Sequence, residues 1–285
     1  MIPLLPFLMC TTLRPLDSRD LPFAHSLSRL AGWNQTLRDW ERFLTLGEGG
    51  CFLAEYDGCP AGTATTTCYG SDLAWVGMVL VHPDFRRRGI GGKLLHRAIN
   101  HLRNDRGIAC VRLDATPEGR PLYESLGFQA EWGLRRWRRE GGGNMNDEAL
   151  RMPEFFDAAF ALDKGVFGAD RSALLRSLAE GSLAGVSLPD GSFGLMRDGE
   201  RAVYLGPVTA GSSASGIAMI ENLVRQCPGD RVIFWDLPDQ NTIATDLALS
   251  LGFRPVRELT RMWLGDAPAP CDPLSIYGLA EPALG

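Results

Sequence analysis

Residues 79–95 read VLVHPDFRRRGIGGKLL. An apolar run ends at Pro83, three arginines follow, and glycines spaced Gly-x-Gly-Gly lead into apolar residues with helical spacing. This order predicts a strand, a tight loop and the N-terminus of a helix. Glycines let the backbone approach a ligand closely, and the first N–H groups of a helix have no partner within it. Together with the helix dipole and the arginines, they predict a site for a pyrophosphate.

Two common phosphate-binding patterns do not fit this loop. No Gly-x4-Gly-Lys-Ser/Thr is present, and Leu94 stands where the third glycine of Gly-x-Gly-x-x-Gly would be. What remains is Arg-x-x-Gly-x-Gly, from Arg86 to Gly91, directly after a predicted strand. This pattern resembles the acyl-CoA loop of the GCN5-related N-acetyltransferase (GNAT) family. A surface turn with solvated arginines is the alternative interpretation.

Length and charge restrict the possible classes of protein. The 285 residues are 45% hydrophobic, which is enough for one large domain or two ordinary ones. The net charge of −5 argues against a general nucleic-acid binder. Up to Gly143 there are 18 Lys+Arg against 15 Asp+Glu, and beyond it 11 against 19. The positive charge that an anionic cofactor needs is therefore in the first part.

Cysteine usage and hydropathy indicate a compartment. Seven cysteines are scattered without a Cys-x-x-Cys pair, so neither a zinc site nor a disulfide framework is predicted, and a reducing cytoplasm fits best. Residues 1–10 are apolar but short and lack a basic leader, which makes a poor signal peptide. No run approaches the ~20 apolar residues needed to span a membrane. We expect a cytoplasmic protein that uses no metal and binds neither nucleic acid nor membrane.

The predicted elements of the first part follow one order. The residue patterns predict strands at 11–16, 51–56, 61–69, 74–81, 108–113 and 128–137, and helices at 21–30, 37–46, 92–103 and 121–126. This order, β-αα-βββ-α-β-α-β, is the one expected for the acetyltransferase fold, so the resemblance covers about residues 11–138. The polar, glycine-rich residues 138–144 predict a linker. We place it at 141–147, between an N-terminal acetyl-CoA-binding domain, 1–140, and a C-terminal domain, 148–285.

The second part of the sequence repeats a short string of the first in a similar order of predicted elements. The string SLGF at residues 125–128 returns at 250–253, and each copy follows a strand that ends in an aspartate, Asp114 or Asp236. Two copies of one fold are the simplest interpretation, and chance repetition is the alternative. The second copy has no glycine loop after Pro207, and it has Ala248 where the first has Tyr123.

This pairing resembles tandem-domain members of the GNAT family, whose C-terminal half is a divergent copy. The fold class expected is therefore α/β (α+β). It would contain two tandem acetyltransferase-type domains, each a mixed, mostly antiparallel sheet flanked by helices, with the second copy degenerate.

The resemblance implies which residues contact acetyl-CoA. The pyrophosphate would lie on the loop, and the acyl and pantetheine arms beside the strand before it, with Met78 or Val79 donating to the thioester oxygen. Thr116 stands where the family often has an asparagine, and its hydroxyl can bond a pantetheine amide. The cofactor-binding residues expected are Val79, Leu80, Val81, Arg86, Arg87, Arg88, Gly89, Ile90, Gly91, Gly92, Lys93 and Thr116.

A catalytic acid is implied by residues 122–128, LYESLGF, which resemble the family's Tyr-x-x-x-Gly-Phe segment. Tyr123 would protonate the leaving thiolate of the cofactor, a role that typically contributes ~10²–10⁴ in rate. A core tyrosine whose hydroxyl has a partner is the alternative. The general base is not identified, and Glu55, His82 and Asp84 are its candidates.

The acceptor pocket is expected at Trp33 and Asn34, because the break between the first two helices lies over the acceptor side in this fold. Trp33 could equally be a core anchor, and Thr65, Thr67, Tyr69 and Trp75 are further possible walls. The acidic second domain is expected to cover this pocket and to favour a cationic amine.

These patterns predict an N-acetyltransferase that moves an acetyl group from acetyl-CoA directly to a primary amine. The acceptor is unidentified and is expected to be a small molecule rather than a protein. The alternative is a non-catalytic acyl-CoA-binding sensor or regulatory protein. Tyr123 argues against a pure binder, which has no need of an acid at the sulfur. The oligomeric state stays open.

Overall fold

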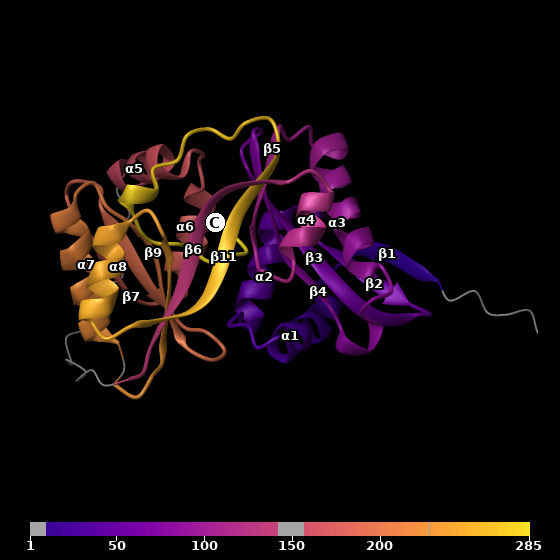
Figure 1. Cartoon of the computed structure of the whole chain (residues 1–285), viewed down its shortest axis with the longest axis horizontal. Helices are drawn as coiled ribbons and strands as arrows, with labels where there is room; N and C mark the ends of the chain where they lie inside the picture. Colours follow the sequence, from indigo (N-terminus) through magenta and orange to yellow (C-terminus); the bar gives the residue numbers. More distant parts are fainter. Residues whose placement is uncertain (1–9, 142–156, 228) are drawn as a thin grey trace, which may run out of the picture.

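The computed structural model describes residues 10–141, 157–227 and 229–285. Its strands form one 12-stranded sheet in the order β1-β2-β3-β4-β5-β11-β6-β10-β9-β8-β7, with β12 paired to β9. The helices flank this sheet on both halves of the molecule (Figure 1). The expected class, mixed sheets flanked by helices in two similar halves, is confirmed.

The first half contains the predicted elements in the predicted order. They are β1 (Thr11–Pro15), α1 (Leu21–Leu30), α2 (Leu37–Gly47), β2 (Phe52–Tyr56), β3 (Cys59–Tyr69), β4 (Leu73–Val81), α3 (Ile90–Asn100), β5 (Cys110–Ala115), α4 (Arg120–Ser125) and β6 (Gln129–Arg139). Most boundaries differ from prediction by one or two residues, and two of the differences bear on the loop and on the predicted linker. Helix α3 begins two residues early, at Ile90, because Gly89 takes the left-handed conformation before it. Arg138 and Arg139 end β6 rather than beginning a linker, and 142–147 lie outside the described residues.

The second half repeats this pattern after two helices. Its elements are α5 (Asp157–Phe167), α6 (Ser172–Ala179), β7 (Ser182–Ser187), β8 (Phe193–Arg197), β9 (Val203–Thr209), α7 (Ser213–Gln226), β10 (Ile233–Pro238), α8 (Thr242–Ser250), β11 (Arg254–Gly265) and β12 (Ile276–Gly278). The repeated SLGF strings occupy equivalent places. The N–H of Phe128 donates to the carbonyl of Tyr123, and the N–H of Phe253 donates to that of Ala248.

Alternating residues of the strands build a core on each face of the sheet in the first half. In β2, Leu53 packs into one cluster with Trp40 of α2, and its neighbour Phe52 packs into another with Leu94 of α3. The period of two along a strand sends successive side chains to opposite faces, so both faces need helices to cover them. Helices α1 and α2 therefore cover one face, and α3 covers the other.

The two halves exchange their last long strands. Strand β11 of the second half pairs antiparallel with β5 of the first, and β6 of the first half pairs antiparallel with β10 of the second. The two exchanged strands also pair with each other, and they run side by side through the middle of the molecule (Figure 1). Leu134 lies opposite Leu259, its equivalent in the other copy. The sheets of the two halves are consequently continuous.

Each exchanged strand carries an arginine that binds an aspartate of the neighbouring strand. Arg261 of β11 donates to both carboxylate oxygens of Asp114 at 2.9 and 3.0 Å. Arg136 of β6 does the same to Asp236 at 2.9 and 2.7 Å. Both aspartate side chains are fully buried. Because the two ion pairs occupy equivalent positions, they fix the exchange in both directions.

Residues 279–285 run between the two halves, where the end of the chain is marked in Figure 1. Their carbonyl groups accept hydrogen bonds from side chains of both halves. From the first half, the Trp75 indole donates to Pro282 at 3.0 Å and the Tyr69 hydroxyl to Leu284 at 2.6 Å. From the second half, Arg171 donates to the Gly285 carbonyl at 2.7 Å. Trp75 and Tyr69 are possible pocket walls by the sequence prediction, but neither lines the cavity described below. They instead hold this segment in place.

Candidate active site

The loop after β4 places a left-handed residue directly before helix α3. Gly89 has φ 75° and Arg87 has φ 61°, so the chain turns sharply and α3 starts with Ile90. Arg86 is turned back onto the strand, where its Nε donates to the Val81 carbonyl at 3.2 Å. Arg88 donates to the Tyr56 hydroxyl at 3.0 Å. Arg87 is exposed, so its charge faces solvent beside the first turn of the helix.

Two glycines of the first helical turn are not required by the fold itself. A Cβ at Gly91 would meet Val81 at 3.6 Å, and one at Gly92 would meet Leu122 at 4.0 Å, both ordinary contacts. Neither glycine has a positive φ. The missing side chains leave the backbone N–H groups of this turn accessible, and such groups bind anions.

Strand β4 separates from β5 after the first third of its length. The two strands pair in parallel only from Leu73 to Trp75 on β4. A bulge then shifts the register against β3, and Met78 within it takes φ 48°. The Thr63 hydroxyl holds this bulge by donating to the Met78 carbonyl at 2.9 Å. Since β5 continues alongside β11 instead, a gap opens between β4 and β5.

A cavity fills this gap, with about 720 Å³ of empty space including the solvent at its mouth. Both halves of the molecule contribute to its wall. The lining residues are Trp33, Gln35, Val76, Gly77, Met78, Val79, Leu113, Asp114, Thr116, Gly119, Tyr123, Arg136, Arg257, Leu259, Pro282 and Ala283. The cavity thus brings together Val79, Thr116, Tyr123 and Trp33, four of the residues predicted for the site.

Tyr123 presents an unengaged hydroxyl to this cavity. Its ring packs edge-on against Phe128, and burial raises the pKa of its hydroxyl to about 12. The buried Tyr69 and Tyr204 donate to Leu284 and Asp236, whereas the Tyr123 hydroxyl has no hydrogen-bond partner within the described residues. A protonated hydroxyl without a protein acceptor is able to give its proton to a bound molecule.

Thr116 and Trp33 lie at the cavity, but Asn34 does not line it. The Asn34 carboxamide accepts from the N–H groups of Arg201 and Ala202 at 2.9 and 3.0 Å and donates to the Ala202 carbonyl at 3.0 Å. Asn34 therefore ties the segment between α1 and α2 to the turn between β8 and β9. Thr116 accepts from the N–H of Gly119 at 3.1 Å, just before α4.

None of the three candidate bases lines the cavity. Glu55 accepts from Arg14 at 2.9 Å on the far edge of the sheet. His82 accepts from the N–H of Asp84 at 3.3 Å, and Asp84 itself is exposed. The further walls considered, Thr65 and Thr67, are buried in β3 and do not reach the cavity either.

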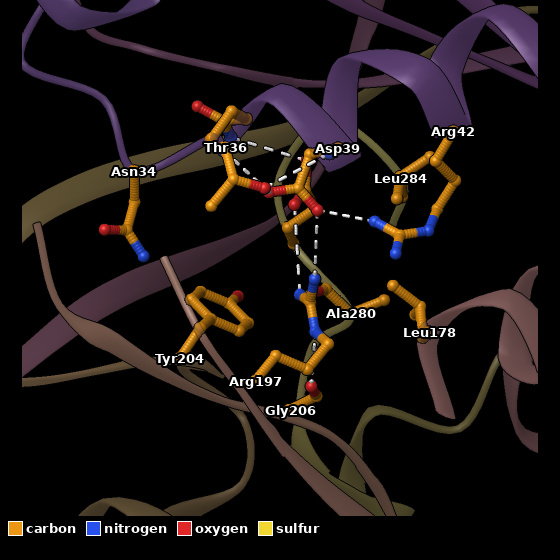
Figure 2. A network of polar contacts seen from close by, with 12 residues as sticks. Asn34, Thr36, Asp39, Arg42, Leu178, Arg197, Tyr204, Gly206, Ala280 and Leu284 are labelled. Carbon is orange, nitrogen blue, oxygen red and sulfur yellow. Dashed lines mark hydrogen bonds and ion pairs between the residues drawn. The ribbon is translucent and has the colours of Figure 1, made fainter. Parts of the chain in front are cut away.

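A buried polar network adjoins the cavity at Gln35 and Arg136, which also line a smaller pocket beside it. Figure 2 shows Asp39 and Arg42 of α2 facing Arg197 of β8. Asp39 accepts from Arg42 at 2.5 Å and lies 3.6 Å from Arg197, which also donates to the Ala280 carbonyl.

Glu281 completes this network. It lies 3.8 Å from Arg197 and accepts from Gln35 at 3.4 Å. Burial raises the pKa of its carboxyl to about 7, and the neighbouring Asp39 adds to the effect. The carboxyl therefore changes charge near neutral pH, one side chain away from the cavity.

Within residues 10–141, 157–227 and 229–285, no group of three or more His, Cys, Asp and Glu is arranged to hold a metal ion. The helices of these same ranges include none with the length and apolar character needed to cross a membrane.

Two family models match this chain, and both are described as acetyltransferase (GNAT) domains. One matches residues 47–130 and the other residues 159–278. Among curated proteins, the uncharacterized N-acetyltransferase YitH of Bacillus subtilis is 29% identical over 224 residues, covering 75% of this chain and 77% of that protein. The holothin acyltransferase of a Pseudoalteromonas species is 23% identical over 270 residues, covering 90% and 89%.

The similarity extends to a solved structure of the same size. The crystal structure of a proposed acetyltransferase from Pyrococcus horikoshii superposes with a TM-score of 0.82 at 23% identity, covering 99% of this chain and 98% of that one. At this identity the match concerns the fold, and it includes both halves of the molecule.

Proposed function

The chain belongs to the GNAT family of acetyltransferases and is an acyltransferase, and on this premise we propose that it moves an acetyl group from acetyl-CoA directly to the primary amine of a small molecule. The observation that best supports this proposal is the Tyr123 hydroxyl. It stays protonated at neutral pH, faces the cavity and lacks an acceptor within the described residues. A protein that only bound acyl-CoA would have no use for a proton donor there.

The cofactor would lie across the loop and along β4. The first turn of α3, with Gly91 and Gly92, offers its N–H groups to the pyrophosphate, and Arg87 adds a charge that no part of the described protein neutralises. The pantetheine would follow Val79–Val81, where β4 has left β5. Acetyl-CoA would supply the activated acetyl group at the bulge.

Transfer would then proceed in one displacement without a covalent enzyme intermediate. The neutral amine attacks the thioester carbonyl, and the N–H of Met78 or Val79 at the bulge stabilises the negative oxygen. The tetrahedral intermediate collapses with loss of the CoA thiolate, which takes the proton of Tyr123. The former amine nitrogen loses its extra proton to solvent, and solvent returns a proton to the Tyr123 phenolate, so the products are the amide and free CoA. The first half would carry this chemistry, and the second would act as a degenerate copy that completes the cavity wall, with the boundary between them at residues 141–147.

The test is release of free CoA from acetyl-CoA with a panel of small amines, amino acids, polyamines and peptides. Turnover with one acceptor class, strongly reduced in Tyr123→Phe, would establish the reaction and its acid. Absence of turnover with every acceptor, together with tight acetyl-CoA binding, would replace the proposal with the acyl-CoA-sensing alternative.

A further inference from the structure

Three charged side chains line the cavity, and the protein neutralises two of them. Asp114 is paired with Arg261, and Arg136 is paired with Asp236. The third is Arg257 of β11, which has neither an ion pair nor a hydrogen bond within the described residues. Of the charged groups in the cavity wall, Arg257 therefore lacks an ion-pair partner, and the carboxylates that act on it at longer range are the exposed Glu118 and Asp236, which is already paired with Arg136.

Arg257 lacks a hydrogen-bonded partner, unlike the arginines that are buried in the structure. Arg42, Arg112, Arg136, Arg171 and Arg261 each donate to a carboxylate, and Arg197 donates to two backbone carbonyls. The guanidinium of Arg257 instead lies over the ring of Trp33, 5.6 Å from its centre. Burial, and then the nearby Arg136, lower the pKa of Arg257 by more than Asp236 and Glu118 raise it, so on balance its surroundings disfavour the charge that it carries.

We propose that Arg257 binds a carboxylate of the acceptor, so that the acetylated amine belongs to an amino acid or to another small amine bearing a carboxylate. This inference rests on the proposed function and names its substrate class. A guanidinium presents two parallel donors that match the two oxygens of a carboxylate. The contact with the Trp33 ring holds the guanidinium at the cavity wall, and partial burial strengthens its pairing with a carboxylate.

The charges of the cavity wall favour an acceptor with a negative group, in contrast to the cationic amine expected from the acidic second half. The second half is acidic as a whole, but it contributes Arg257, Leu259, Pro282 and Ala283 to the cavity and no carboxylate. A polyamine would meet the uncompensated guanidinium, and like charges at close range repel. An amino acid brings the negative charge that the wall lacks.

The experiment compares amines that differ only in the carboxylate, such as alanine with ethylamine and phenylalanine with phenethylamine, in the CoA-release assay. The wild-type protein is expected to favour the carboxylate member of each pair by about 10- to 100-fold in kcat/KM, as hydrogen bonds to charged groups warrant. Arg257→Gln is expected to remove this preference, mainly through KM for the carboxylate acceptors. Arg257→Lys keeps the charge but loses the two parallel donors. Its preference for the carboxylate member is expected to lie between those of the wild type and Arg257→Gln.

Two controls separate this effect from general damage. Arg254→Gln changes an exposed arginine of the same strand and should leave the preference unchanged. The Kd of acetyl-CoA should be equal in all four proteins. Equal loss of turnover with both members of a pair in Arg257→Gln would overturn the proposal, as would a wild-type preference for amines without a carboxylate.

If no amine is acetylated, the proposed function fails. The carboxylate site is then tested separately, by measuring whether amino acids bind. The Tm of the protein in the presence of CoA is then measured with and without the amino acids of the panel. A rise in Tm that disappears in Arg257→Gln would support the carboxylate site. Equal Tm values with and without every amino acid would overturn it.

Discussion

The Tyr123 hydroxyl keeps its proton over the whole neutral range, because burial raises its pKa to about 12. Tyr123→Phe removes the proton donor and leaves the ring. We expect kcat to fall by ~10²–10⁴-fold while the Kd of acetyl-CoA is unchanged. In the wild-type protein, loss of the Tyr123 proton should not reduce kcat below about pH 10.

Steady-state kinetics and an acetyl-CoA titration check this prediction. Tyr277→Phe is the matched control, since Tyr277 is a buried tyrosine of the second half and does not line the cavity. Wild-type kcat in Tyr123→Phe would contradict the role as acid.

Gly91 has room for a small side chain within the protein but not, by our proposal, for a large acidic one beside the phosphates. Gly91→Glu is expected to abolish acetyl-CoA binding, because the carboxylate fills the space over the first turn of α3 and repels the pyrophosphate. Calorimetric titration with acetyl-CoA measures this binding. Gly165→Glu is the control, because Gly165 is an exposed helical glycine with nothing near its added Cβ. Normal binding by Gly91→Glu would reject the loop as the cofactor site.

Among the elements, the exchanged strands depend on buried ion pairs. Arg261→Gln leaves the carboxylate of Asp114 fully buried without its partner, and we expect the free energy of unfolding to fall by about 3–5 kcal/mol. Adding Asp114→Asn removes the unpaired charge, so the double variant should be more stable than the single one. Denaturant unfolding measures both.

The control for this pair is Arg138→Gln. The ion pair of Arg138 with Glu140 is exposed and should contribute at most about 1 kcal/mol to the free energy of unfolding. An Arg261→Gln protein as stable as Arg138→Gln would show that the pairing of β11 with β5 does not need this charge.

For the whole molecule, the exchange makes the halves dependent on each other. A protein ending at residue 141 lacks β11, so the edge of β5 that β11 covers is left unpaired and the cavity loses Arg257 and Leu259. We expect this fragment to be insoluble or unfolded when expressed alone, and to be rescued by co-expression with residues 142–285. Solubility and circular dichroism test it. A soluble fragment with cooperative unfolding and unchanged acceptor preference would contradict it.

The network between the halves should make stability depend on pH. Burial, with a contribution from Asp39, raises the pKa of Glu281 from 4.5 to about 7, so the folded protein binds a proton that the unfolded chain releases. Between these two values, stability therefore falls as the pH rises, by a total on the order of 1–3 kcal/mol. Arg42, Arg197, Asp39 and Gln35 face this carboxyl.

Glu281→Gln should lose this dependence. Its Tm relative to wild type should be higher at pH 8.5 than at pH 5.5, whereas Glu258→Gln, an exposed change, should show no such difference. A Tm difference between Glu281→Gln and wild type that does not vary with pH would contradict the shifted pKa.

Much of the fold could be predicted from short stretches of sequence. The element order of the first half, the glycine loop and the equivalence of Tyr123 with Ala248 all follow from patterns within a few residues of each other. Hydrophobic periodicity and glycine conformation act locally, so they are readable without tertiary contacts. The two-copy pattern was readable for the same reason, because a repeat is a property of the sequence itself.

Only the tertiary structure decided which strands pair across the halves and what lines the cavity. Every strand presents the same backbone donors and acceptors, so the sequence did not distinguish β6 from β11 as the neighbour of β5. Arg257 lines the cavity because β11 is exchanged, and Ala283 lines it because residues 279–285 run between the halves. Asn34 does not line the cavity and instead bonds Arg201 and Ala202 in a turn far along the chain. The local chemistry of transfer was therefore visible in the sequence. The wall facing the acceptor was not, because residues distant in the chain meet there only after folding.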